Sequence, residues 1–234
     1  AQLALRHADD AILAAREARL SGHVSVGMAP STASVLGVPF INAMRESYPD
    51  VRLHLVESLS GNLERMINTR QLDLAIVFQQ EKILRWSARP VLEERLFLIG
   101  THALLAPLQE DHISPDQLTS LPLIMPSQGH GLRGRLEAVC QQHHLSVEVV
   151  ADIDGLALLM QATLQPGAAI SHLDHQALRV IDVVNPILSR PNFLVSLSDD
   201  ELTPAGLAAR VILSKVMRQL VESDRWPGAT LYAH

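Results

Sequence analysis

The sequence contains little cysteine, few aromatic residues and only two lysines, Lys82 and Lys215. Its one cysteine, Cys140, leaves no disulfide possible within the chain, which is typical of a reducing compartment. Cys140 lies in a helical pattern, and we expect it to be a small buried hydrophobic residue. Aromatic residues make up 3% of the chain, so Leu, Val, Ile and Ala must build the core. A content of 47% hydrophobic and 19% charged residues argues against general disorder.

Long apolar runs and basic runs are also missing. No apolar run approaches the ~18 residues of a membrane helix and no signal-peptide pattern is found, so we expect a cytoplasmic protein without membrane contact. The net charge is −6. Because affinity for nucleic acids comes largely from neutralising phosphates, any contact with DNA must come from another segment. The chain begins with Ala, and we expect a fragment or a trimmed product.

The hydrophobic periodicity predicts an α/β protein preceded by a helix. Residues 1–20 place Leu5, Ala8 and Ile12 near heptad spacing, so we expect a helix that packs against a second copy of the chain. Residues 23–28, 51–56 and 72–78 have strand patterns, with helices between them. This β-α-β-α-β succession predicts a parallel sheet with right-handed crossovers.

The pattern then restarts, which predicts a second lobe. Strands are expected at 87–92, 95–100, 121–125, 147–151, 168–173, 180–184 and 193–197, with helices at 132–144, 154–163 and 203–223. We predict two Rossmann-like lobes, with crossings near Gly100-Thr101 and near Arg190-Pro191-Asn192. Lobe I then comprises residues 21–99 and 193–234, and lobe II residues 100–192.

Ligands of open α/β sheets bind beyond the carboxyl ends of the strands, where helix N-termini present free N–H groups. The loops expected there are rich in Ser, Thr and Gln, which suits a small anion or carboxylate. Ordinary helix capping is the alternative explanation for these hydroxyls. The candidate effector-binding residues are Ser31, Thr32, Ser60, Phe78, Gln79, Thr101, Ser127, Gln128 and His172.

Patterns for other chemistry are weaker. Gly129 to Gly134 match G-x-G-x-x-G, with Asp152 about 20 residues on, but three residues separate the strand from the first glycine, and Arg133 and Arg135 are bulky. Neither His143-His144 nor the residues from His172 to His175 have zinc-site spacing. No Gly-x-Ser-x-Gly elbow occurs, and the acidic runs 93–94 and 199–201 are interpreted as solvated turns. We therefore expect no catalytic residues, no cofactor and no metal.

Six motifs, in order along nearly the whole chain, resemble the effector-binding domains of LysR-type transcriptional regulators. They are Leu20-Ser-Gly-His-Val-Ser-Val-Gly-Met-Ala-Pro30, Tyr48-Pro-Asp-Val-Arg-Leu53, Leu55-Val-Glu57, Gln71-Leu-Asp-Leu-Ala-Ile76, Glu93-Glu-Arg-Leu-Phe-Leu-Ile-Gly100 and Leu121-Pro-Leu-Ile-Met-Pro126. Residues 26–30 and 96–101 resemble most the nitrogen assimilation control type. One departure is the stretch from Gly167 to Asp174, which lacks the second glycine and the proline of the family pattern.

The resemblance implies a periplasmic-binding-protein-like fold of type 2 that holds a small effector between two lobes, or that acts without an effector, as some regulators of the nitrogen type do. It implies effector contacts at Ser31, Thr32, Ser60, Ser127 and Gln128. It also implies a homodimer or homotetramer in which residues 1–20 are the linker helix and DNA is bound by a winged helix-turn-helix absent from this chain. RNA polymerase is a further partner open to the full-length protein.

Two alternatives of other classes stay open from the sequence. One is an exported solute-binding protein of the same architecture, for which the heptad helix would have no role. The other is a nucleotide-dependent enzyme that uses the glycines from 129 to 134. The regulator hypothesis differs from both because it requires self-association and no DNA binding by these 234 residues alone.

Overall fold

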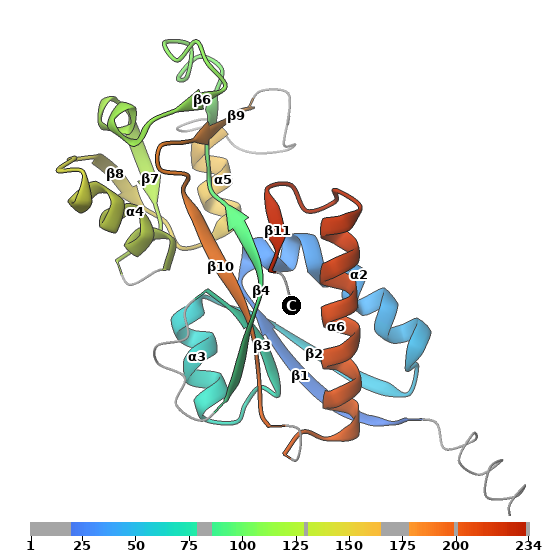
Figure 1. Ribbon diagram of the computed structural model, residues 1–234. Helices are drawn as coiled ribbons and strands as arrows, with labels where there is room; N and C mark the ends of the chain where they lie inside the picture. The colour runs from blue at the N-terminus through green and yellow to red at the C-terminus, as the bar shows by residue number, and fades with distance from the viewer. Residues whose placement is uncertain (1–19, 79–85, 129–130, 165–177, 199–200, 233–234) are drawn as a thin grey trace, which may run out of the picture.

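Two lobes joined by two long strands form the part of the chain that the structure describes (Figure 1). The structure is a computed structural model that describes residues 20–78, 86–128, 131–164, 178–198 and 201–232. The predicted helix 1–20, except for Leu20, lies outside these residues. So do Gln79, His172 and the predicted strand 168–173.

Lobe I begins with the β-α-β-α-β succession that the sequence predicts. Its elements are β1 (Gly22–Met28), α2 (Pro30–Ser47), β2 (Val51–Glu57), α3 (Ser60–Asn68) and β3 (Leu74–Val77). β1 pairs in parallel with both β2 and β3, so the predicted parallel sheet is confirmed. All four residues of β3 are buried, because helices cover both faces of this part of the sheet.

Later segments of the chain complete the sheet of lobe I. These are β4 (Ser87–Arg95), β10 (Ser189–Ser196), β11 (Ala229–Leu231) and helix α6 (Pro204–Glu222). The strand order is β11-β4-β10-β3-β1-β2, and β10 runs antiparallel to both β3 and β4. Helix α6 begins as predicted, since Thr203 Oγ1 accepts a hydrogen bond of 3.0 Å from Gly206 N. No pattern in the sequence predicts β11.

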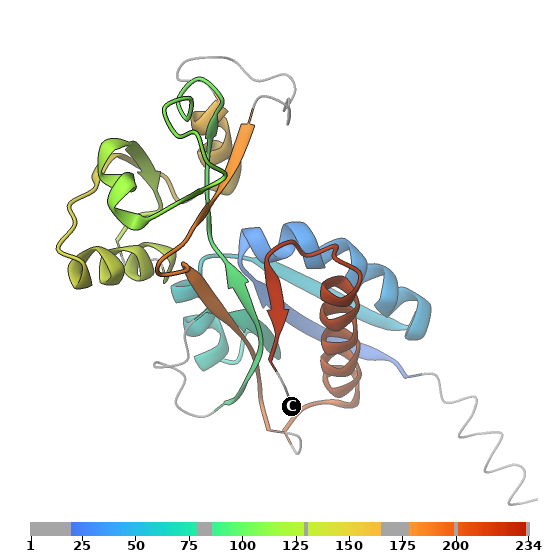
Figure 2. The same ribbon diagram turned by 45° about the horizontal axis from the view of Figure 1, so that its top comes forward.

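Two hydrophobic clusters cover the two faces of this sheet. Helices α2 and α6 pack on one face, where Val24, Val26 and Phe40 belong to the larger cluster. Helix α3 packs on the other face through Leu63 and Ile67. Figure 2 shows α6 lying along the sheet beside α2, so the C-terminal helix belongs to lobe I as the sequence predicts.

The described part of lobe II contains two small sheets, two α-helices and a 3-10 helix. Its elements are β5 (Phe97–Thr101), β6 (His112–Ile113), the 3-10 helix η1 (Pro115–Ser120), β7 (Pro122–Met125), α4 (Gly131–Gln142), β8 (Glu148–Asp152), α5 (Leu156–Leu164) and β9 (Leu178–Val183). The strands pair in the order β5-β9-β6 and, separately, β7-β8. Cys140 is buried here, as expected, and burial raises the pKa of its thiol.

The lobes divide a few residues earlier than the sequence-based boundaries. Residues 97–99 pair with β9 in lobe II, and residues 189–192 pair with β4 in the sheet of lobe I. The chain therefore crosses at Leu96 and Leu188, whose backbones are joined by a 2.8 Å hydrogen bond from Leu96 N to Leu188 O. Pro191 suggested a connection, but the strand tolerates it because residues 189–192 pair on one side only.

Helix capping does not explain the hydroxyl groups at the start of α2. Helix α2 begins at Pro30 after Ala29, without a side-chain cap, so the Ser and Thr residues at its start are not needed for capping. In lobe II, the carboxylate of Asp154 accepts hydrogen bonds from Ser127, so this predicted site residue is already engaged.

Gly27 fixes the distance between α3 and the sheet, and this generates a stability prediction. A Cβ at Gly27 would lie 2.5 Å from Leu72 Cδ1 and 2.7 Å from Leu63 Cδ2. We expect Gly27→Ala to destabilise the fold by about 1–3 kcal/mol through overpacking, measured by urea unfolding. Gly37→Ala is the matched control, because a Cβ there meets nothing within 4 Å and the helix gains up to about 1 kcal/mol. Equal stability of the two variants would contradict this packing.

Candidate functional site

The candidate site lies at the edge of the lobe I sheet that faces lobe II. Met28, at the end of β1, pairs with Glu57 at the end of β2 and with Ile76 near the end of β3. One edge of the sheet therefore carries the first residues of α2 and α3, Pro30 and Ser60, together with Phe78, the residue that follows β3. Beyond this edge β10 continues from Phe193 back to Ser189, so both lobes meet here.

Buried polar atoms without partners gather along this edge. Thr32 and Asn192 are 0% exposed and Ser60 is 5% exposed. The hydroxyl oxygens of Thr32 and Ser60 have no hydrogen-bond partner within the described residues. The same holds for the nitrogen and the oxygen of the Asn192 side-chain amide. A buried polar group left without a partner costs about 1–3 kcal/mol. These atoms are thus well suited to bind polar groups of a ligand.

A buried ion pair sits at the same edge. Arg190 and Glu94 face each other across β10 and β4, with Arg190 Nε 2.7 Å from Glu94 Oε2. Their side chains are only 8% and 12% exposed. The same guanidinium donates to Ser31 Oγ at 2.8 Å and stacks 3.8 Å above the ring centroid of Phe78. Two predicted site residues, Ser31 and Phe78, are therefore brought together by an arginine.

Sequence reasoning missed this arginine and its carboxylate partner. Glu94 was assigned to a solvated turn, but it lies in β4 and also accepts a 3.1 Å hydrogen bond from Trp226 Nε1. Arg190 was assigned to a connecting segment. The sequence does contain a signal for this ion pair, which is the pair of opposite charges on the two strands that lead between the lobes. That signal can be recognised only when the register of the two strands is known.

Glu93 is the second carboxylate at the hinge, which is the place where the chain crosses between the lobes beside β4 and β10. It contacts three parts of the chain. It accepts hydrogen bonds from Ser189 Oγ and from the Tyr232 hydroxyl. Burial is the main cause, and the hydrogen bond to Glu93 the second cause, that raises the pKa of Tyr232 to about 12. Arg135, from helix α4 of lobe II, lies 4.0 Å from Glu93 and donates to Ser189 O at 3.1 Å. Glu93 thus joins lobe II and the C-terminal segment to the hinge.

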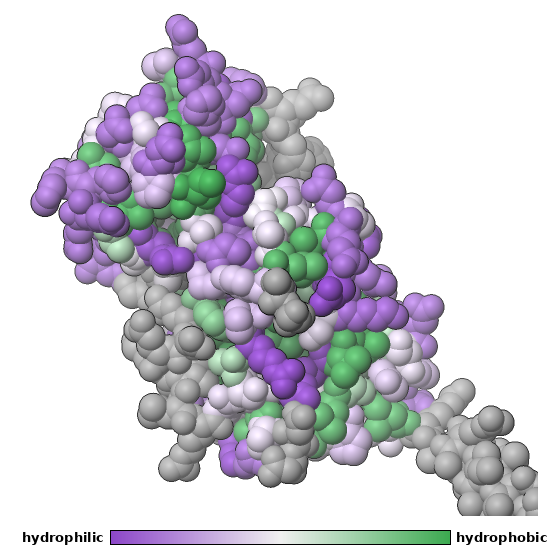
Figure 3. Space-filling model, viewed as in Figure 1, coloured by the Kyte–Doolittle hydropathy of each residue, from purple (hydrophilic) through white to green (hydrophobic). Residues whose placement is uncertain are grey.

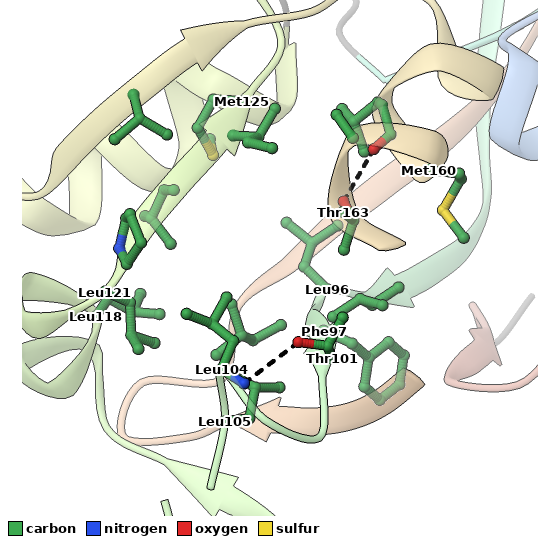
Figure 4. Close-up of a pocket in the computed structure, with 18 of the residues that line it drawn as sticks. Leu96, Phe97, Thr101, Leu104, Leu105, Leu118, Leu121, Met125, Met160 and Thr163 are labelled. Atoms are coloured by element: carbon green, nitrogen blue, oxygen red, sulfur yellow. Dashed lines mark hydrogen bonds between the residues drawn. The ribbon is translucent and has the colours of Figure 1, made fainter. Parts of the chain in front are cut away.

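The predicted residues of lobe II take other roles. Ser127 donates to Asp154 from both its backbone N, at 2.9 Å, and its Oγ, at 2.8 Å. Gln128 is exposed at the end of a described stretch. Thr101 Oγ1 accepts a 3.2 Å hydrogen bond from Leu104 N and lines a cavity inside lobe II (Figure 4). Thr101 is therefore not brought together with Ser31, Thr32 and Ser60.

The cavity inside lobe II is large and apolar. It measures about 1120 Å³ and is lined chiefly by apolar side chains, many of them leucines from β5, η1, β7, α4, α5 and the segments between them. The Thr163 hydroxyl in its wall is used by a 2.9 Å hydrogen bond to Leu159 O, as Figure 4 shows. The cavity borders α5, and residues 165–177, which follow this helix, lie outside the described residues. Few polar groups here are free to orient a ligand.

The described residues that bear on dinucleotide binding are engaged with one another. Arg133 Nη1 lies 2.9 Å from Asp152, the carboxylate that a ribose would need, and Arg133 Nε lies 2.6 Å from Glu137. In the described part of the chain no three His, Cys, Asp or Glu side chains cluster as a metal site would require. Within the same residues, no helix has the length and apolarity to span a bilayer.

Two lobes with a hinged junction and a polar edge define an effector-binding domain, and comparisons with known proteins agree. The family model described as LysR substrate binding domain matches residues 17–218. The chain therefore belongs to the LysR family of transcription regulators, as its effector-binding domain, and this family is not enzymatic. The recognised resemblance and the two-lobe fold are thus confirmed.

Named relatives fit the same family. The nitrogen assimilation regulatory protein nac of Escherichia coli K12 is 28% identical over 97% of this chain and 77% of its own length. The protein of that name from Klebsiella aerogenes is 27% identical over 95% of this chain. The effector binding domain of QuiR in complex with shikimate superposes with a TM-score of 0.73 at 17% identity, covering 86% of this chain and 99% of that domain. Membership decides against the enzyme and solute-binding alternatives.

The buried pair of Arg190 and Glu94 generates a prediction. Glu94→Gln keeps an oxygen for Trp226 but leaves the arginine charge buried without its counterion, which costs about 3–5 kcal/mol. We expect the melting temperature to fall by about 6–20 °C. Replacing both residues, as Glu94→Leu with Arg190→Met, should recover most of the loss, because an apolar pair of similar volume is often as stable.

The control for this prediction is Glu201→Gln. It breaks the exposed pair of Glu201 with Arg70, which has a similar contact of 2.9 Å but side chains 40% and 69% exposed, and should cost under about 1 kcal/mol. Equal effects of the two Glu→Gln changes would show that the hinge pair is not a buried ion pair in solution.

Proposed function

We propose that this domain senses a small polar molecule held between its lobes, at the carboxyl edge of the lobe I sheet. The observation that carries the proposal is the set of unpartnered buried polar atoms of Thr32, Ser60 and Asn192 at the junction of the two lobes. Hydroxyl and amide groups that have no internal partner favour a ligand that supplies one.

An anion is the ligand that best suits this edge. The N-termini of α2 and α3 point free N–H groups and partial positive charge to it, and the Arg190 guanidinium lies in its wall beside Ser31. Because Glu94 balances the arginine charge, a single carboxylate or other small anion is a better match than a highly charged molecule. We place Ser31, Thr32, Ser60 and Phe78 in contact with it, and Ser127 and Gln128 in lobe II as further contacts. Gln79 and His172, which lie outside the described residues, stay contacts predicted from the sequence.

We further propose that the domain works as a homodimer or homotetramer in the cytoplasm. In such a regulator, DNA is bound through a segment other than these 234 residues, whose net charge of −6 repels phosphates. RNA polymerase is the second partner that the family implies. In lobe I, β2 is one of the two edge strands of the described sheet and Val38 on α2 is 67% exposed, which leaves one side of this lobe suited to a second copy.

Thr32→Val separates a ligand-binding role from a structural one. Removing an unpartnered buried hydroxyl should raise the melting temperature of the free domain. The same change should weaken effector binding by about tenfold, the value of one hydrogen bond of ~1.4 kcal/mol. The measurement is a thermal-shift screen of small carboxylates, amino-acid derivatives and inorganic anions, because a ligand of the folded state raises its melting temperature.

Thr230→Val is the matched control, at an exposed position of β11, and should leave every ligand-induced shift unchanged. The proposal fails if no compound of the screen stabilises the wild-type domain. It also fails if Thr32→Val and the wild type respond equally to the compounds that do.

A further inference from the structure

A second pocket lies at the other end of the lobe I sheet, between α6 and the strands β4, β10 and β11. It has a volume of about 450 Å³, within the range of small-molecule sites. Ser196 in its wall is six residues along β10 from Arg190, which corresponds to about 20 Å of strand. The pocket is therefore separate from the site between the lobes.

Positive charge is concentrated around this pocket. Four cations line it, namely Arg89 from β4 and Arg210, Lys215 and Arg218 from α6. None of the described lining residues carries a carboxylate. Arg218 also lies 3.9 Å from Glu222, but both side chains are more than half exposed, so this pair is weak. In a chain with 19 basic and 25 acidic residues, four cations around one pocket are a local excess of positive charge among the described lining residues.

Hydroxyl groups and an apolar floor accompany these cations. Ser196 is 2% exposed, and its Oγ accepts a 3.3 Å hydrogen bond from Arg210 Nη1, so one guanidinium is oriented by the sheet. Ser87 and Ser214 also line the pocket, and Val91, Leu194 and Met217 form its apolar part. In Figure 3, which shows this side of lobe I, strongly hydrophilic residues lie directly beside hydrophobic ones.

Cations held around an apolar floor repel one another, and an anion that binds among them removes this repulsion while making charge-assisted hydrogen bonds. We propose that the pocket binds a small organic anion, with its phosphate or carboxylate group between Arg89 and Lys215 and its apolar body on the floor. A long acidic protein segment suits it less, because the volume matches one small molecule. This second site is independent of the function proposed for the site between the lobes.

Calorimetric titration of the whole 234-residue chain tests the proposal with phenyl phosphate, benzoate and inorganic phosphate. Phenyl phosphate and benzoate carry the same ring on different anionic groups, and inorganic phosphate lacks the ring. We expect an aromatic anion to bind at least tenfold more tightly than inorganic phosphate. The double variant Arg89→Ala/Lys215→Ala should weaken this binding at least tenfold, because two of the four cations are lost.

Arg45→Ala/Arg52→Ala is the control, since it removes the same net charge from exposed positions of α2 and β2 and should bind as the wild type does. Val211→Asp adds a carboxylate to the lining at a position 63% exposed, where folding tolerates it, and should abolish binding. Thr32→Val, in the site between the lobes, should leave it unchanged.

Three results would overturn the proposal. One is equal weakening by both double variants, which would indicate general attraction of anions. Another is loss of binding in Thr32→Val, which would place the anion between the lobes. The third is binding of a polyglutamate peptide that requires Arg89 and Lys215 without binding of any small anion, which would assign the pocket to an acidic protein partner.

Discussion

The ion pair between Arg190 and Glu94 determines how the two lobes are joined. It links the two strands that cross between them, at the position where β10 has left β3 and pairs with β4 alone. One guanidinium there contacts a carboxylate, the hydroxyl of Ser31 and the ring of Phe78. Because a buried charge requires compensation, the start of α2, the end of β3 and the hinge strands must keep their relative positions for the pair to form.

The C-terminal segment depends on the same pair of strands. Trp226 donates to Glu94 and Tyr232 donates to Glu93, while β11 pairs with the outer edge of β4. Neighbouring carboxylates on one strand point to opposite faces, so the segment after α6 contacts both faces of the hinge. A sequence element that is remote from the predicted loops thereby helps to set the geometry of the site.

The sequence predicts the fold well because hydrophobic periodicity reports burial directly. The β-α-β-α-β succession of lobe I follows from patterns such as the continuous apolar run of β3, and α6 follows from the cap Thr203 and its apolar face. The lobe boundaries were predicted less accurately. Pro191 locally indicates a turn, but β10 accommodates it because this part of the strand pairs on one side only, and that pairing is a property of the whole sheet.

The site was only partly predictable, for a related reason. Ser31, Thr32, Ser60 and Phe78 could be selected because each follows a parallel strand, and the structure places them along one edge. Arg190, Glu94 and Asn192 lie in antiparallel strands from distant parts of the sequence, and only the register of β4 and β10 brings them there. The partners of Ser127 and Thr101, which are Asp154 and a backbone N–H, likewise depend on tertiary contacts that local patterns do not encode.

The two lobes differ in what they offer a ligand, and this difference bears on how the domain could respond to one. Lobe I presents unpartnered hydroxyl and amide groups on a rigid sheet edge, whereas the hydroxyls of Ser127 and Thr163 in lobe II are already hydrogen-bonded. A ligand therefore gains most of its polar contacts from lobe I. In the proposed function, lobe II would close over the ligand, and the hydrogen bond from Arg135 to Ser189 O connects lobe II to the strands that cross between the lobes. Since a ligand shifts a conformational equilibrium only by its differential affinity for the two states, closure must add contacts from lobe II to those already made at the lobe I edge.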